Sequence, residues 1–275
     1  MKKMTSALFA TVVAMTLCGG AQAALLATFS GVDRNTAADP DVDIPVFTSS
    51  FAATAETAFF VKLSNGIGTE NFESQTPGPV ANSGLSLNFN GLSATLNGGS
   101  PEIIKVNVPG ADGSGSQYSG PTDGSGRYSV GAGTNKALIA DAGTGNFTIR
   151  FNQAVAAFGF NGIDVGDFGG LLTVQLLDQN GNALDGAVAS VNNSTGPTAS
   201  GALLYFGLVS DVDFWGVNFL MTGSDGADTF GFDNFTMANR RQLSDVPGGD
   251  VPEPTSMLLA LAALAATAAA RRSRR

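Results

Sequence analysis

The chain has no histidine, and its single cysteine, Cys18, lies close to the N-terminus. Without histidine there is no Ser-His-Asp or Cys-His nucleophile system, no histidine-ligated zinc and no histidine general base. Beyond Cys18 the sequence has no thiol, so the rest of the chain cannot form a disulfide, a thiolate metal site or a cysteine nucleophile. A domain of this length can bury enough apolar surface to fold without disulfides. A lysine-containing phosphate loop is also missing.

Positive charge is scarce in the body of the chain. The whole sequence has a net charge of −9, from 14 basic and 23 acidic residues. Six of the basic residues lie in the first three and last five positions, so residues 24–250 keep 8 basic and 22 acidic side chains, a net charge of −14. Such a domain repels nucleic acid phosphates and anionic lipid surfaces. We therefore expect no nucleic acid partner, and a setting that suits divalent cations and neutral glycans.

The N-terminal segment has the three regions of a secretory signal peptide. Lys2 and Lys3 supply positive charge, residues 7–17 form an apolar run, and Ala21-Gln22-Ala23 offers the small residues that signal peptidase requires. The apolar run is shorter than the roughly 20 residues of a permanent membrane anchor. We predict a signal peptide over residues 1–23, cut after Ala23 by signal peptidase.

The C-terminus holds a second apolar segment followed by a basic cluster. Residues 255–270 would span about 24 Å as a helix, somewhat less than the roughly 30 Å hydrocarbon core of a bilayer. The four terminal arginines can reach the interface with their long side chains and are expected on the cytoplasmic side; they are Arg271, Arg272, Arg274 and Arg275. No face of the run is polar, which argues against an ordinary amphipathic helix. We predict a transmembrane helix that places the preceding chain outside the inner membrane.

The four residues before this segment, Val251-Pro252-Glu253-Pro254, complete a pattern. Motif, apolar helix and arginine cluster together resemble the PEP-CTERM sorting signal, over residues 251–275. The resemblance implies that an exosortase, a membrane cysteine protease, removes the tail and passes the protein to the cell surface or an exopolysaccharide matrix. The same short domain is also known as the ice-binding protein C-terminal domain, a name that describes the tail and gives no evidence of ice binding.

Between the two ends, short apolar–polar alternations are separated by glycine, asparagine and aspartate, which is typical of strands and turns. Clear alternations occupy residues 85–89, 147–151 and 230–235, and residues 171–177 and 213–221 indicate two more strands. Asn180-Gly181 predicts a hairpin turn, and no capped helical periodicity appears between residues 28 and 250. We predict an all-β, antiparallel, jelly-roll-like β-sandwich over residues 24–238, followed by a linker over residues 239–250.

A glycine- and serine-rich stretch at residues 109–134 interrupts the strand pattern. Long loops of this kind are either functional or disordered. One interpretation is a mobile surface loop. The other is a ligand-binding loop in which Tyr118 and Tyr128 provide stacking surfaces for sugar rings.

Oxygen-rich loops suggest one cofactor. Carboxylates and amides in Asp/Asn/Gly turns are the hard ligands that calcium prefers. By analogy with jelly-roll glycan-binding modules, Glu70 or Glu73 would meet Asp233 in a calcium site. The alternative is that these acids are solvated turn formers. The triplet Asp39, Asp41 and Asp43 lacks the glycine and terminal glutamate of an EF-hand loop, and we interpret it as an acidic surface loop.

A glycosidase stays possible without histidine or cysteine, because its chemistry needs only two carboxylates across a cleft. The predicted sandwich has four glutamates, and nothing marks two of them as a pair. We therefore assign no catalytic residue and expect a non-enzymatic surface or matrix protein, with binding to exopolysaccharide as a further expectation. The alternative is an extracellular enzyme that acts on polysaccharide through a carboxylate pair.

Overall fold

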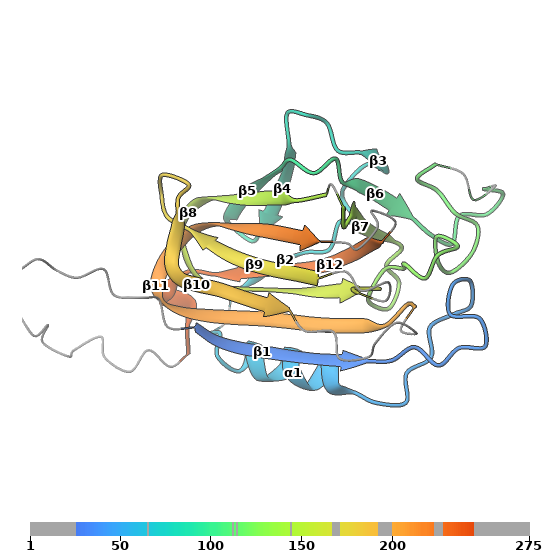
Figure 1. Ribbon diagram of the computed structural model, residues 1–275, viewed down its shortest axis with the longest axis horizontal. Coiled ribbons are helices and arrows are strands. Elements are labelled where there is room, and N and C mark those ends of the chain that lie inside the picture. Colours follow the sequence, from blue (N-terminus) through green and yellow to red (C-terminus); the bar gives the residue numbers. More distant parts are fainter. Residues whose placement is uncertain are drawn as a thin grey trace, which may run out of the picture.

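The computed structural model describes residues 26–244, except residues 65, 112, 114, 144, 167–170, 192–199 and 223–227. Strands dominate this part of the chain (Figure 1). They are β1 (Leu26–Asp33), β2 (Gly68–Glu70), β3 (Gly78–Pro79), β4 (Leu85–Phe89), β5 (Leu92–Asn97), β6 (Glu102–Lys105), β7 (Lys136–Asp141), β8 (Phe147–Ile163), β9 (Leu171–Leu177), β10 (Ala183–Val191), β11 (Leu203–Thr222) and β12 (Thr229–Ala238). The helical elements are α1 (Phe51–Phe60) and the 3₁₀ turn η1 (Arg240–Gln242).

Two long strands, β8 and β11, run through both layers of a folded antiparallel sheet. Their register shifts between Val209 and Phe214, and each strand changes partners there. One layer contains β1, the first half of β11, the second half of β8, and β12 with β7 and β2. The other contains β10, β9, the second half of β11, the first half of β8, β5 and β4. The prediction of an antiparallel, mostly β domain is confirmed.

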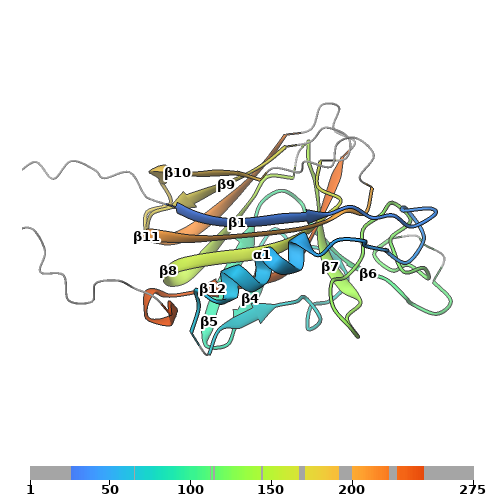
Figure 2. The same cartoon turned by 90° about the horizontal axis from the view of Figure 1, so that it is seen from below.

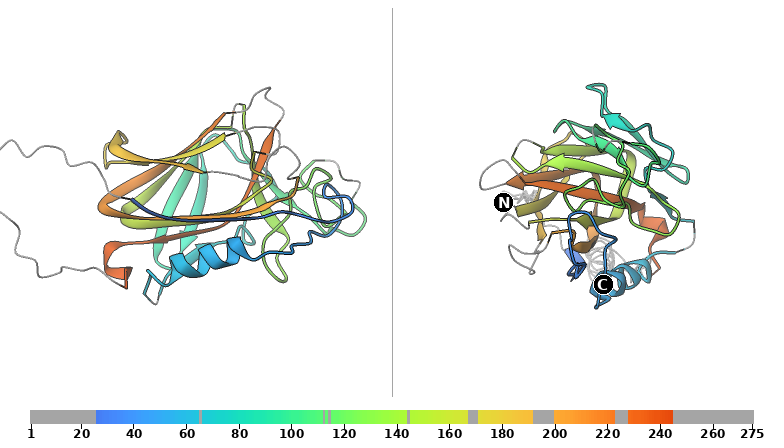
Figure 3. Two further views of the ribbon diagram at one scale, coloured as in Figure 1. Left: turned by 60° about the horizontal axis from the view of Figure 1, so that its bottom comes forward. Right: turned by 90° about the vertical axis from the view of Figure 1, so that its right-hand side faces the viewer.

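Figure 3 shows the strands of the two layers facing each other. Buried phenylalanine rings fill the space between them. Phe219 stacks on its strand neighbour Phe147 with ring centroids 4.4 Å apart, and it meets Phe160 of the other layer at 5.1 Å. Aromatic pairs of this kind add to the free energy of apolar burial, which is the main stabilising contribution in such a core. The inward positions of β4 follow the predicted alternation, and the strands predicted at residues 85–89 and 171–177 begin and end where expected.

Helix α1 was not predicted, and the expectation of strands and turns throughout residues 28–250 is wrong at this place. The helix lies along the outside of the layer that contains β1, β11 and β8 (Figure 2). It buries Ala52, Ala55 and Phe59 against Tyr205 and Ala157. No side chain caps its first turn locally; instead, the Asp33 carboxylate at the end of β1 accepts hydrogen bonds from the Phe51 and Ala52 amides, at 2.7 and 3.1 Å.

The predicted linker begins inside the folded domain. Asn239 and Gln242 form a capping box at the N-terminus of η1. Leu243 pairs with Leu63 in an isolated bridge. The Ser244 amide donates to the Lys62 carbonyl at 2.9 Å. Residues 239–244 therefore belong to the domain, while residues 245–250 lie outside the described residues.

The two ends of the domain differ in character. The start of β1 and η1 lie at one end, and the long loops at residues 34–50 and 106–135 lie at the other (Figure 1). Both predicted targeting segments, residues 1–23 and 251–275, are outside the described residues. Within the described part of the chain, none of the helices has the length and apolarity needed to cross a bilayer.

Candidate functional site

The described residues of the loops at 34–50 and 106–135 form a loop cluster at one end of the sandwich. Asn35 organises the first loop from inside, because its buried side-chain oxygen accepts from the Ala37 and Val46 amides at 3.1 and 3.0 Å. Backbone pairing with Lys105 and Val108 holds the second loop around Tyr118. These hydrogen bonds hold both loops at defined points. The two interpretations of residues 109–134, a mobile surface loop and a ligand-binding loop, both stay predictions.

Asp41 joins the two loops. Its carbonyl oxygen accepts from the Thr122 hydroxyl and from the Gly126 amide, the latter at 3.0 Å. Its carboxylate accepts from the Ser200 hydroxyl. The acidic triplet was interpreted as an acidic surface loop. It is also a structural junction, because Asp41 holds the neighbouring loop in place.

A largely buried ion pair between Arg127 and Asp123 stabilises the second loop. Arg127 Nε donates to Asp123 Oδ2 at 2.6 Å, and the other Asp123 oxygen accepts from the Ser125 and Arg127 amides. Arg127 also donates to the Thr229 carbonyl at 3.3 Å and lies 3.9 Å from the Asp164 carboxylate. The arginine thus ties the loop to β12, and removing it would take a positive charge away from the buried Asp123 and Asp164 carboxylates.

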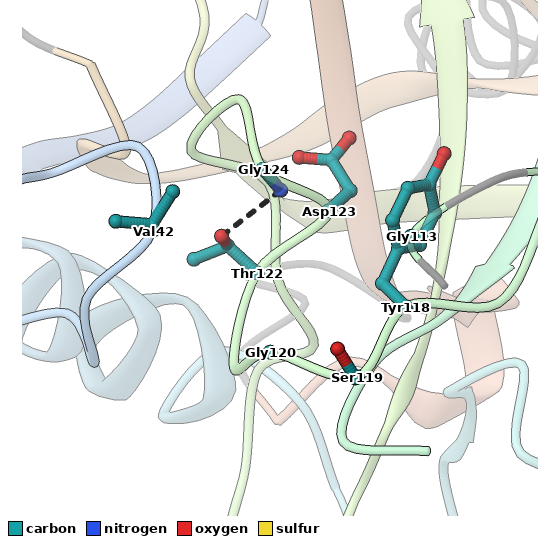
Figure 4. Close-up of a pocket in the computed structure, with 8 residues that line it drawn as sticks. All are labelled: Val42, Gly113, Tyr118, Ser119, Gly120, Thr122, Asp123 and Gly124. Atoms are coloured by element: carbon teal, nitrogen blue, oxygen red, sulfur yellow. Dashed lines mark hydrogen bonds between the residues drawn. The ribbon is translucent and has the colours of Figure 1, made fainter. Parts of the chain in front are cut away.

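A half-open pocket of about 260 Å³ lies in this loop cluster. Figure 4 shows Tyr118 on one side and Val42 on the other, with Thr122 and Asp123 between them. The remaining lining comes from Ser119 and from glycines at positions 113, 120 and 124. An aromatic ring beside hydroxyl groups is the mixture of apolar and directed polar groups that small polar ligands use.

The two tyrosines proposed as stacking surfaces have different environments. Tyr118 lines the pocket and is partly exposed; burial, and then Asp123, raise its pKa. Tyr128 is only 6% exposed, donates its hydroxyl to the Gly201 carbonyl at 3.2 Å and packs its ring near Phe47. Burial raises the pKa of Tyr128 well above its usual range. A stacking role for Tyr128 does not fit this environment, because its ring is part of the loop cluster's interior.

Glu70, Glu73 and Asp233 do not assemble into the predicted calcium site. Glu70 accepts from the Phe72 and Asn88 amides at 2.9 and 3.0 Å, and Glu73 accepts from the Asn135 and Lys136 amides at 2.8 and 2.7 Å. Asp233 is fully buried and accepts from the Val130 amide at 2.7 Å. In the part of the chain that the structure describes, no three acidic side chains converge to hold a metal. The carboxylates instead cap backbone amides.

The same hydrogen bonds argue against Glu70 and Glu73 as a catalytic carboxylate pair. A general acid or nucleophile must face the substrate. The oxygens of Glu70 instead accept from the Phe72 and Asn88 amides, and Glu73 accepts from the amides of Asn135 and Lys136 at the start of β7. The pocket-lining residues Val42, Thr122 and Asp123 were not picked out from the sequence. The sequence offers one signal for this site, the opposite charges of Asp123 and Arg127 four residues apart. Such a spacing is too common to single out a binding site.

Among the comparisons with known proteins, the family match lies in the C-terminal tail. Residues 250–275 match the model of the PEP-CTERM protein-sorting motif. This chain carries a PEP-CTERM sorting signal. The match confirms the resemblance of Val251–Pro254 and the residues that follow, and it indicates an exported protein that is processed at the membrane. The individual roles of the motif residues, of the terminal arginines and of Ala21 and Ala23 fall outside the described residues and stay predictions.

Solved structures show a distant similarity to the folded domain of this chain. The K2 cleaved adhesin domain of Lys-gingipain aligns with 64% of this chain and 99% of its own, at 13% identity and a TM-score of 0.37. The CBM22-1 xylan-binding domain of Paenibacillus barcinonensis Xyn10C aligns with 64% of this chain and 96% of its own, at 10% identity and a TM-score of 0.28. TM-scores this low say nothing about function. No curated protein matches the chain significantly.

Proposed function

We propose that this protein is a non-enzymatic, exported component of the cell surface or exopolysaccharide matrix, built on a jelly-roll-like sandwich and sorted through its PEP-CTERM tail. The sorting motif at residues 250–275 carries the proposal. In this scheme signal peptidase removes residues 1–23, the tail holds the precursor transiently in the inner membrane, and exosortase cleaves near Val251–Pro254.

The position of the loop cluster supports a role in ligand binding. The described chain ends at Ser244, near η1, and the loop cluster lies at the opposite end of the sandwich (Figure 1). A domain tethered through its C-terminus therefore presents the pocket beside Tyr118 away from the membrane. We propose that this pocket binds a sugar unit of a surface polysaccharide, with the tyrosine ring against the apolar face of the sugar.

The sorting proposal is tested by the intact mass of the protein recovered from the culture medium and from the envelope of its host. We expect a released form that lacks residues 1–23 and the residues after about position 252. A full-length C-terminus that stays in the membrane would show that the tail is a permanent anchor. Replacing Pro252 and Glu253 by alanine should trap the precursor in the membrane, whereas Arg241→Ala, at an exposed position of η1, provides a control close in sequence but outside the motif.

A further inference from the structure

The solvent-facing side of the layer formed by β4, β5, β8, β11, β9 and β10 is a second surface with a distinct chemistry. A row of side chains crosses it from strand to strand at paired positions: Asn97, Thr148, Asn218, Gln175 and Val188. Thr95 and Thr173 lie on the same face in the adjacent rows. These side chains are half-exposed or exposed. Five adjacent strands give the row a length of about 19 Å.

Hydrogen bonds between side chains fix the centre of this row. The Thr148 hydroxyl donates to Asn218 Oδ1 at 2.6 Å, and Asn218 Nδ2 donates to Gln175 Oε1 at 3.3 Å. The chain of hydrogen bonds runs in one direction, which polarises its members and holds their rotamers. Gln175 is half-exposed at the end of this chain, so its amide nitrogen can donate to a ligand. A ligand would meet groups that are already ordered, and it would lose less entropy on binding.

Charge is scarce in this layer, although the protein is strongly acidic. Residues 85–89, 92–97, 147–152, 171–177 and 216–222 contain no acidic side chain and one basic side chain, Arg150, and the edge strand β10 adds one exposed carboxylate, Asp185. The Arg150 guanidinium is engaged: it crosses the flat surface of Gly216 and donates to the Asp178 and Gln179 carbonyls at 3.0 and 2.8 Å. The face therefore offers hydroxyl and amide groups without an accessible concentration of either charge.

This chemistry selects among classes of ligand. Protein interfaces have apolar, aromatic-rich centres, and no aromatic side chain occupies the outward rows named above. Nucleic acids and acidic polymers require accessible cations. A neutral polysaccharide fits, because its hydroxyl groups both donate and accept and it has no charge to neutralise.

We infer that this face binds an extended neutral polysaccharide chain, at a site separate from the pocket beside Tyr118. The inference rests on the proposed placement of the protein in a polysaccharide environment, and it adds the class of polymer and the surface. The chain lies across the strands, along the row that contains Thr148, Asn218 and Gln175, with Thr173 beside it. Uncharged ligand chemistry also explains how an acidic protein can contact a matrix without electrostatic attraction.

The test is affinity electrophoresis of residues 24–275 through gels that contain dextran, galactomannan or arabinoxylan, with alginate as the acidic comparison. We expect retardation by at least one neutral polymer and none by alginate. Thr173→Asp places a carboxylate in the face, which binding would have to desolvate, and should weaken the association at least tenfold. Thr54→Asp is the matched control, because Thr54 is exposed on α1, on the outside of the other layer. Ser190→Asp, at an exposed position of β10, repeats the test if Thr173→Asp lowers the melting temperature.

The outcomes separate this inference from the proposed function. Loss of retardation in Thr173→Asp or Ser190→Asp, with retention in Thr54→Asp and Tyr118→Ala, supports the face. Retention in both face variants, equal loss in the α1 control, or no retardation of the wild-type protein by any neutral polymer overturns it. Loss only in Tyr118→Ala overturns the face and leaves the pocket proposal standing. Failure of tail processing in the mass measurement overturns the sorting proposal without affecting the electrophoresis result.

Discussion

The ring of Phe59 lies directly against the backbone of Gly207: a Cβ at Gly207 would stand 2.7 Å from the ring's Cδ2 atom. The contact lets α1 approach β11 closely enough to bury Phe59 completely. Gly159, in the neighbouring strand, leaves room for the same ring and for the Tyr205 hydroxyl. Two glycines on adjacent strands thus provide the depression in which the helix is seated.

Gly207→Ala should therefore destabilise the domain by about 1–3 kcal/mol, the usual cost of overpacking a filled interior. The added methyl group cannot fit unless Phe59 and α1 move outward. The measurement is the free energy of unfolding by urea. Gly120→Ala is the matched control, because a Cβ there meets its first neighbour at 3.6 Å, an ordinary contact. Equal stabilities of the two variants would contradict the close packing of helix on strand.

Asp33 should contribute to the same helix from its N-terminal end. Its carboxylate accepts from the Phe51 and Ala52 amides and from the Ser49 hydroxyl, at 2.7, 3.1 and 2.6 Å. A carboxylate at this position satisfies unpaired amides and interacts favourably with the helix dipole. Asp33→Ala should cost about 1–2 kcal/mol in the free energy of unfolding, and Asp33→Asn should cost less because one acceptor oxygen remains. A loss of helical circular dichroism in the alanine variant alone would locate the effect at α1.

These contacts explain why the strands were easier to predict than the helix. Strands β4 and β9 have one buried face, so their alternation is visible in the sequence. Residues 155–163 of β8 are buried on both faces. One face lies against the core, and the other is covered by α1 at Ala157 and Gly159, so the alternation disappears there. The cap of α1 comes from Asp33, eighteen residues before Phe51, so no local motif marks the helix start.

The candidate site was predictable only in part, for a similar reason. The composition of residues 109–134 indicated a loop with two tyrosines, but which ring faces the pocket depends on contacts with distant segments. Tyr128 is buried through its bond to Gly201, and Val42 reaches the pocket because Asp41 joins the two loops. The acidic residues suggested calcium, although their oxygens are used by backbone amides. Pairings of this kind are decided by tertiary structure.

Asp233 should make stability fall as the pH rises. Complete burial raises the pKa of Asp233 from 3.8 to about 8, against the hydrogen bonds from Val130, Asn234 and Ser129 that lower it. Because the folded state binds the proton more tightly than the unfolded state, this group's stabilising contribution is fully present below about pH 4 and is lost as the pH rises through about 8. Asp233→Asn should therefore gain stability relative to the wild type between pH 5 and pH 9.

The measurement is the difference in unfolding free energy between variant and wild type across that range. Asp178→Asn serves as the control, because hydrogen bonds from the backbone of Asn182 lower the pKa of this exposed carboxyl. A lowered pKa affects stability only under acidic conditions, as the group becomes protonated, so the control difference should stay constant from pH 5 to pH 9. A constant difference for Asp233→Asn as well would mean that the buried carboxyl titrates normally.

Tyr118 should govern binding at the pocket. Its backbone is held by Lys105 and Val108, but its ring also packs against the buried cluster of Ile104, Val106 and Ala137, so the melting temperature of each variant is measured beside its affinity. Tyr118→Ala should weaken the association with short neutral oligosaccharides about tenfold or more, since it removes the aromatic wall of the pocket. Tyr118→Phe keeps the ring and should retain most of the affinity, which isothermal titration calorimetry with dextran-derived oligosaccharides can measure. Equal affinity of Tyr118→Ala and wild type would exclude the pocket as a sugar site, whereas equal loss in the phenylalanine variant would assign the contribution to the hydroxyl group.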